Sequence, residues 1–161
     1  MAQEDKALLE RLQQHGVEFV LIGGVCGVIH GSGLLTVDLD VCCPENLRLL
    51  ESALRELHPW HRLTPNKLPF VLTDELCSSL KNLYLQADLG KLDCLGDVLG
   101  VGDYEAALSR SIEFNMSFGP MRMLDLETLI VSKEAAGREK DKYALPILRA
   151  LAEKKNRTRK S

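Results

Sequence analysis

The sequence contains no long hydrophobic run. No apolar stretch in its 161 residues approaches the roughly 18 that a membrane-spanning helix needs, so we expect no membrane partner. A secretory signal, which begins basic and then turns apolar, is also lacking, because residues 1–5 are acidic and polar. Both absences indicate a cytoplasmic protein.

The sequence also lacks the cysteine spacing of a zinc site or a disulfide framework. Its five cysteines are an odd number, and no C-x-x-C pair occurs among them. Free thiols, buried in a protein of the reducing cytoplasm, explain them better. They are Cys26, Cys42, Cys43, Cys77 and Cys94.

An excess of positive charge is absent as well. The net charge of −3 creates no global positive field that would steer nucleic acid to the surface. Basic residues do cluster at the C-terminal end of the chain, between Lys154 and Lys160. We predict that residues 154–161 form a flexible, solvated tail; the alternative is a weak contact of this tail with RNA or DNA phosphates.

The remaining composition is that of an ordinary folded domain. Apolar residues make up 45% of the chain, and we find no internal repeat and no low-complexity segment. Segments with helical and with alternating hydrophobic periodicity follow one another along the sequence. We therefore predict one α+β domain over residues 1–153, with a small mixed or antiparallel sheet flanked by helices and two C-terminal helices packed on it.

Periodicity, capping residues and turn residues predict the individual elements. Pro146 falls in the last predicted helix, which can tolerate it only in the first turns. The predicted helices cover residues 7–14, 25–30, 45–57, 104–109, 125–136 and 141–154. The predicted strands or extended pieces cover residues 17–22, 37–43, 70–72, 83–87, 92–95 and 121–124.

Two glycines and two carboxylates carry the strongest functional signal. Gly23 and Gly24 end the apolar run at residues 19–22, and a short helix follows them directly. Glycines at the start of a helix allow a phosphate group to approach backbone N–H groups. Asp38 and Asp40 alternate with apolar residues on the next strand, so both carboxylates point to the same face. Taken alone, the two aspartates are more typical of a solvent-facing strand, and the two glycines are typical of a tight strand-to-helix turn; together the motifs favour a metal–nucleotide site.

A third carboxylate would complete such a site. Asp93 is the best candidate, because it lies between Leu92 and Cys94 on a predicted strand and points away from the apolar face. Asp88 is a rival, but Leu89-Gly90 follows it and places it in a turn. Asp97 and Asp103 are predicted to lie in loops.

Together these segments resemble the nucleotidyltransferase superfamily, which has the polymerase-beta-like fold. The closest resemblance is to small bacterial nucleotidyltransferase-like proteins related to the toxins of abortive-infection toxin–antitoxin systems. The matching segments are residues 19–24, 30–31, 36–40, 85–93, 125–133 and 137–141, and they span most of the chain.

The resemblance implies a Mg²⁺-dependent enzyme that moves a nucleoside monophosphate from a nucleoside triphosphate to a hydroxyl of RNA, protein or a small molecule. It implies two metal ions, with Mn²⁺ as a substitute, and a toxin–antitoxin partner protein. Asp38, Asp40 and Asp93 would be the catalytic and metal-binding residues. The implied nucleotide-binding residues are Gly23, Gly24, Thr36, Lys133, Arg138 and Lys140.

Some features favour other readings. Relatives often carry a basic residue two positions before the threonine, where this chain has Leu34. A missing cation there favours a non-catalytic nucleotide-binding or regulatory module that keeps the fold. The basic residues at 133, 138 and 140 can also serve only to solvate helix ends, and Lys140 can form an ion pair with Asp141. A third reading is an interaction protein that acts through its partner.

Overall fold

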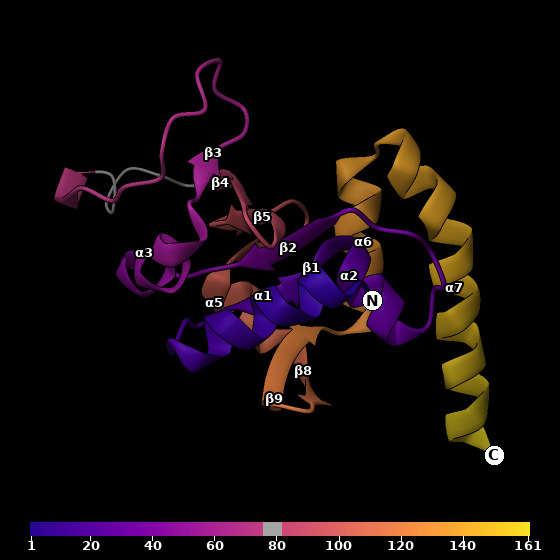
Figure 1. Cartoon of the computed structure of the whole chain (residues 1–161). Helices are drawn as coiled ribbons and strands as arrows, with labels where there is room; N and C mark the ends of the chain where they lie inside the picture. The colour runs from indigo at the N-terminus through magenta and orange to yellow at the C-terminus, as the bar shows by residue number, and fades with distance from the viewer. Residues whose placement is uncertain (76–81) are drawn as a thin grey trace.

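The computed structural model describes residues 1–75 and 82–161 and has an α+β fold, as predicted (Figure 1). Residues 76–81, which include Cys77, lie outside the described residues. One mixed sheet of seven strands forms the centre, in the order β3-β4-β5-β2-β1-β9-β8. Its strands are β1 (Val20–Ile22), β2 (Asp38–Cys42), β3 (Trp60–His61), β4 (Asn82–Ala87), β5 (Gly90–Leu95), β8 (Ser111–Met116) and β9 (Gly119–Leu124).

The strand directions show why the sheet is mixed. β2 pairs antiparallel with β1 but parallel with β5, and β1 pairs parallel with β9. Two antiparallel hairpins, β4–β5 and β8–β9, extend the sheet outwards. The central strands β1 and β2 are mostly apolar, and Leu21, Leu39 and Val41 are fully buried. Strand β2 therefore carries Asp38 and Asp40 at its partly exposed positions, among buried apolar residues.

Helices cover the sheet and close the core. α1 (Gln3–Gln14) buries Leu8, Leu9 and Leu12, which recur on one side of the helix. It begins four residues before the predicted start. α3 (Arg48–Leu54) continues into the 3₁₀ turn η1 (Arg55–Leu57), and together they are shorter than the helix predicted over residues 45–57.

The two C-terminal helices lie together on the side of the sheet near α2 (Gly23–His30) (Figure 1). α6 (Leu126–Ala136) has the predicted ends: the Asp125 side chain accepts a hydrogen bond from the Thr128 N–H, and Gly137 adopts a left-handed conformation. α7 (Glu139–Lys160) follows after a two-residue connection. This arrangement confirms two C-terminal helices packed against the rest of the fold.

α7 differs from its prediction at both ends. It begins at Glu139, so Pro146 lies in its third turn and removes the hydrogen bond that an N–H there would give to the carbonyl of Lys142. It also continues to Lys160, so residues 154–160 form its last turns rather than an irregular tail. Basic side chains at a helix C-terminus interact favourably with the helix dipole, which offsets their mutual repulsion.

Several short elements were not predicted or were predicted wrongly. The strand predicted over residues 70–72 is absent; only Pro69 forms an isolated bridge, to Trp60. β8 was missed, although its polar and apolar residues alternate as they do on a half-buried strand. A second small sheet pairs β6 (Asp97–Val98) with β7 (Gly102–Asp103), so Asp97 and Asp103 lie on strands and not in loops. α5 (Tyr104–Ser109) has the predicted bounds.

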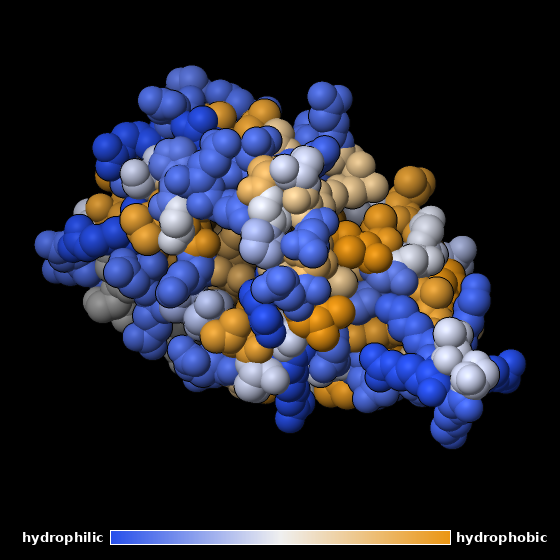
Figure 2. All heavy atoms as spheres, turned by 90° about the horizontal axis from the view of Figure 1, so that it is seen from below, coloured by the Kyte–Doolittle hydropathy of each residue, from blue (hydrophilic) through white to orange (hydrophobic). Residues whose placement is uncertain are grey.

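The surface is mixed in polarity. Figure 2 shows hydrophobic atoms in patches between hydrophilic side chains on the face seen from below. Among the described cysteines, all four have free, buried thiols, as expected; they are Cys26, Cys42, Cys43 and Cys94. No helix in the described part of the chain combines the length and the apolar character that a membrane crossing requires.

Candidate active site

The pairing of β2 with β5 brings the three predicted carboxylates to neighbouring positions. In the parallel register Asp40 lies opposite Asp93, and Asp38 lies opposite Lys91. Adjacent strands are about 4.8 Å apart, and paired residues point to the same face of a sheet. Asp38 and Asp40 are half-buried, whereas Asp93 is buried. The sheet thus places three acidic side chains side by side on one face.

The diglycine lies directly against the middle carboxylate. Ile22, the last residue of β1, is the register partner of Asp40, and α2 begins at Gly23. Gly23 has φ +68°, and a Cβ atom there would overlap the Asp40 carboxylate. A Cβ at Gly24 would lie 2.6 Å from Thr36 Oγ1, so the second glycine leaves room for the threonine. Both glycines are therefore needed for the close approach of the strand that carries Asp38 and Asp40.

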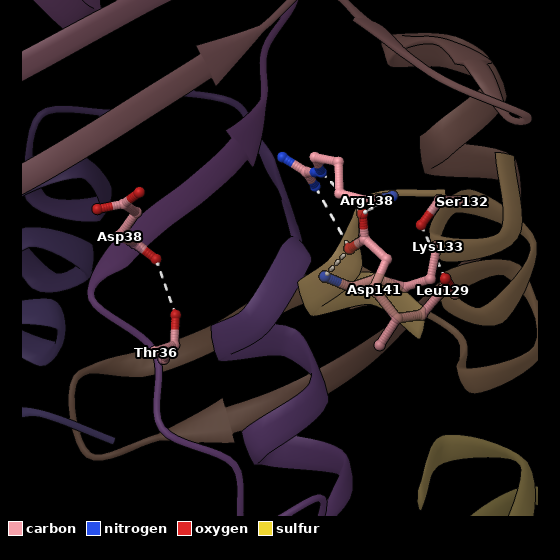
Figure 3. Close-up of polar contacts among 7 residues, drawn as sticks. All are labelled: Thr36, Asp38, Leu129, Ser132, Lys133, Arg138 and Asp141. Atoms are coloured by element: carbon pink, nitrogen blue, oxygen red, sulfur yellow. Dashed lines mark hydrogen bonds and ion pairs between the residues drawn. The ribbon is translucent and has the colours of Figure 1, made fainter. Parts of the chain in front are cut away.

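The first turn of α2 offers hydrogen-bond donors at this position. The N-cap residue of α2 is Ile22, whose side chain makes no capping hydrogen bond, so the first N–H groups of the helix keep their capacity to bind an anion. Thr36 Oγ1 donates instead to the carbonyl oxygen of Asp38, at 3.3 Å, and holds the start of β2 in place (Figure 3).

Two adjoining cavities connect these groups. The first has a volume of about 260 Å³ and the second about 560 Å³, and Gly23, Asp40, Lys133 and Lys140 line both. Every predicted site residue lines one or the other. Asp93 and Arg138 belong to the first cavity, and Gly24, Thr36 and Asp38 belong to the second.

Two of the predicted basic residues are held by one buried carboxylate. Asp141, which is fully buried, accepts hydrogen bonds from Lys133 Nζ at 3.0 Å and from Arg138 Nε at 2.7 Å (Figure 3). Burial alone would raise the pKa of Asp141, but the hydrogen bonds from Arg138 and Lys133 lower it below its ordinary value. The ion pair suggested between Lys140 and Asp141 is therefore not formed, and Lys140 makes no ion pair with any described residue.

Asp40 is the central carboxyl of the site. Burial is the main cause that raises its pKa, to about 7, and the charge of Asp93 raises it further. Lys140 acts in the opposite direction, as a nearby positive charge. Among the described residues no side chain donates a hydrogen bond to the Asp40 carboxylate. The ionised form of Asp40 is thus under-compensated in the protein alone.

One residue that contacts two of the carboxylates was not predicted from the sequence. Arg62, which follows β3, donates from Nη2 to both carboxylate oxygens of Asp93, at 2.5 and 2.7 Å. The same nitrogen lies 4.0 Å from Asp38 Oδ2, and Lys91 Nζ lies 3.9 Å from Asp38 Oδ1. Arg62 stands between two of the three predicted metal ligands.

No sequence signal pointed to Arg62. It occurs in the segment interrupted by Pro65 and Pro69, where hydrophobic periodicity is lost. A buried Asp93 does require a compensating cation, but that requirement does not say which part of the chain supplies it. Tyr84 also lines the first cavity.

The donor set fits one divalent ion better than two. Asp38 and Asp40 supply carboxylate oxygens, and Asp38 Oδ1 is buried without any hydrogen-bond donor. Asp93 does not fit as a ligand in this arrangement, because Arg62 engages both of its oxygens. The described residues contain no group of three or more histidine, cysteine, aspartate or glutamate side chains arranged to hold a metal ion.

The position of Leu34 bears on nucleotide binding. Leu34 and its neighbour Leu35 line the second cavity, where the resemblance leads one to expect a cation. Leu35 is fully exposed, as are most of the side chains of Val37 and Tyr143, which line the same cavity. This wall of the cavity is apolar, and the positive charge comes from Lys133 and Lys140 on the opposite helices.

Comparison with known proteins adds no family assignment. A scan against models of known protein families and a search of the curated proteins both found no match to this chain. The functional conclusion therefore depends on the site itself and on the motif resemblance.

Proposed function

We propose that this protein binds a nucleoside triphosphate with Mg²⁺ and transfers its nucleoside monophosphate to a hydroxyl acceptor. The observation that supports this most directly is the contact between Asp40 and the diglycine at the start of α2. It places an under-compensated carboxylate beside free backbone donors, with Lys133 and Lys140 on the opposite wall of the same cavities. Carboxylate, backbone N–H and lysine are the groups that a metal-bound polyphosphate needs.

Each group has a distinct task in this proposal. The N–H groups at the start of α2 bind phosphate oxygens, and Lys133 and Lys140 offset the remaining negative charge. Asp38 and Asp40 hold one Mg²⁺, which when bound neutralises and polarises the phosphates. The acceptor oxygen then forms a bond to the α-phosphorus while the bond to the bridging oxygen breaks and pyrophosphate leaves. The hydroxyl proton passes to a carboxylate of the site.

A second candidate is a non-catalytic nucleotide-binding or regulatory module in the cytoplasm. Two observations favour it: Arg62 engages Asp93, and Leu34 stands where a cation is expected. The exposed apolar side chains of Leu35, Val37 and Tyr143 near the site are compatible with a partner protein, such as the other half of a toxin–antitoxin pair. Both candidates share nucleotide binding and differ only in turnover.

Calorimetry tests the shared part. The wild-type protein should bind a nucleoside triphosphate in the presence of Mg²⁺, and Asp38→Asn combined with Asp40→Asn should abolish the Mg²⁺-dependent binding. Asp88→Asn is the matched control, because Asp88 is an exposed aspartate whose ion-pair partner among the described residues is His58, away from the site. Equal affinity in the wild type and the double variant would refute the site.

Turnover separates the two candidates. The protein is incubated with a triphosphate labelled at the α-phosphate and with cell extract, and labelled macromolecules and released pyrophosphate are measured. A labelled acceptor that depends on Asp38 and Asp40 supports the enzyme. Binding without label transfer and without pyrophosphate supports the regulatory module.

A further inference from the structure

The contacts of Arg62 extend the proposed function, on which this inference rests for the identity of the metal site. Arg62 is one of the few charged side chains beside the carboxylates that is mostly buried, with 19% of its side chain exposed. Its guanidinium contacts both carboxylate oxygens of Asp93 on β5 and lies near the carboxylate of Asp38 on β2, so it links these two strands. A divalent ion shared by Asp38 and Asp93 would have to occupy this same space.

The position of Arg62 is built into the fold. Its backbone N–H donates to the carbonyl oxygen of Tyr84, at 3.0 Å, and its guanidinium carbon lies 5.6 Å from the centre of the Tyr84 ring. Tyr84 is in turn the register partner of Asp93 on β5. Backbone and side chain of Arg62 are thus both held against β4, the strand that pairs with β5 and its Asp93, which lowers the entropy lost in forming the ion pair.

A guanidinium and a metal ion compete for Asp93. They carry the same sign of charge, and the two oxygens of Asp93 are already used by Arg62 Nη2. Within the described part of the chain, Asp38 Oδ1 accepts no hydrogen bond and has only Lys91 Nζ nearby, at 3.9 Å, and Arg62 Nε donates none. Asp38 and Asp40 therefore keep their capacity to bind a cation, whereas Asp93 does not.

We propose that the Arg62 guanidinium permanently takes the place of one divalent ion, so that the site binds one metal ion fewer than its three carboxylates would otherwise hold. Asp93 then serves to position Arg62 and is not a metal ligand. Arg62 supplies a fixed positive charge at that end of the site, where related chemistry with two ions would place a second metal.

Counting bound Mn²⁺ on the protein alone tests this, with free Mn²⁺ measured by electron paramagnetic resonance. Arg62→Gln should bind one more ion per chain than the wild type, and Arg62→Gln with Asp93→Asn should return to the wild-type number. Arg55→Gln is the matched control, because Arg55 pairs only with Glu51 on the surface, and it should leave the number unchanged. Equal numbers in wild type and Arg62→Gln, including none in either, overturn the proposal.

A second variant keeps the test valid if Arg62→Gln does not fold. Asp93→Asn in the otherwise unchanged chain should bind as many Mn²⁺ ions as the wild type, whereas Asp40→Asn should bind one fewer. A loss of one ion in Asp93→Asn would show that Asp93 is a ligand and would overturn the proposal. Nucleotide binding that requires Asp38 and Asp40, together with such a result, would refute the role of Arg62 and leave the proposed function standing.

Discussion

The close contact between the diglycine and Asp40 predicts a specific cost for adding one methyl group. Gly23→Ala introduces a Cβ where the Asp40 carboxylate now lies, on a backbone with φ +68°. Gly16→Ala is a matched control, since Gly16 has φ +70° and a Cβ there would have nothing within 4 Å. Both variants place alanine on a left-handed backbone, but only Gly23→Ala also brings its Cβ into the space of the Asp40 carboxylate.

The magnitudes follow from these two contributions. A left-handed conformation costs a non-glycine residue about 1–2 kcal/mol, and both variants should lose that much free energy of unfolding. Overpacking adds about 1–3 kcal/mol, and only Gly23→Ala should lose it. We therefore expect Gly23→Ala to be less stable than Gly16→Ala by about 1–3 kcal/mol, and we expect it alone to lose nucleotide binding.

Urea unfolding followed by circular dichroism gives the free energies, and calorimetry gives the nucleotide affinity. Combining Gly23→Ala with Asp40→Ala should recover part of the loss, because two of the three overlapping atoms are the carboxylate oxygen and carbon of Asp40. Equal destabilisation by Gly23→Ala and Gly16→Ala would refute the reasoning, as it would mean that β2 does not press against the diglycine.

Two further predictions concern the carboxyl groups themselves. Asp141→Asn should lower the free energy of unfolding in urea by about 3–5 kcal/mol, because the mostly buried Lys133 loses its partner. Glu139→Gln, in an exposed pair, is the control and should change it by about 0.5 kcal/mol or less. Similar losses in both variants would contradict the buried pair. The pKa of Asp40 is raised from an ordinary 3.8 to about 7, so the folded state keeps this proton up to a higher pH than the unfolded state does. Metal-free wild type should therefore lose stability relative to Asp40→Asn as the pH rises from about 4 to about 7, by up to about 4 kcal/mol, and parallel pH profiles would refute the shift.

Much of the site was predictable because short-range rules determine it. Alternation along β2 fixed the common face of Asp38 and Asp40, and the same alternation on β5 placed Asp93 away from the core. Asp125 and Gly137 gave the ends of α6, since capping depends on residues within one turn. Lys133 and Arg138 came instead from the family resemblance, and both line the first cavity.

The parts that were not predicted depend on contacts between distant segments. Arg62 reaches Asp93 across 31 positions of sequence, through a strand of two residues that has no periodicity to detect. Similarly, Lys133 on α6 pairs with Asp141 on α7, eight positions away. The pair of Arg138 with Asp141 is local, because Asp141 is the third residue of α7 and its carboxylate turns back toward the helix start. Pairing between separate elements follows from packing and not from sequence spacing.

The charges around the three carboxylates divide into two groups, and this division has a functional consequence. Arg62 and Lys91, on the β3–β5 side, are near Asp93 and Asp38, whereas Lys133 and Lys140, from α6 and α7, face Asp40 across the cavities. Lys133 is already held by Asp141, and Lys140 is exposed, so neither makes an ion pair with Asp40. Without a ligand, the positive charges of the protein therefore compensate Asp93 and Asp38 better than they compensate Asp40. If the proposed function holds, a bound cation gains most at Asp40 and the phosphate bound at the diglycine lies beside that same carboxylate, so metal and nucleotide should bind more tightly together than either does alone.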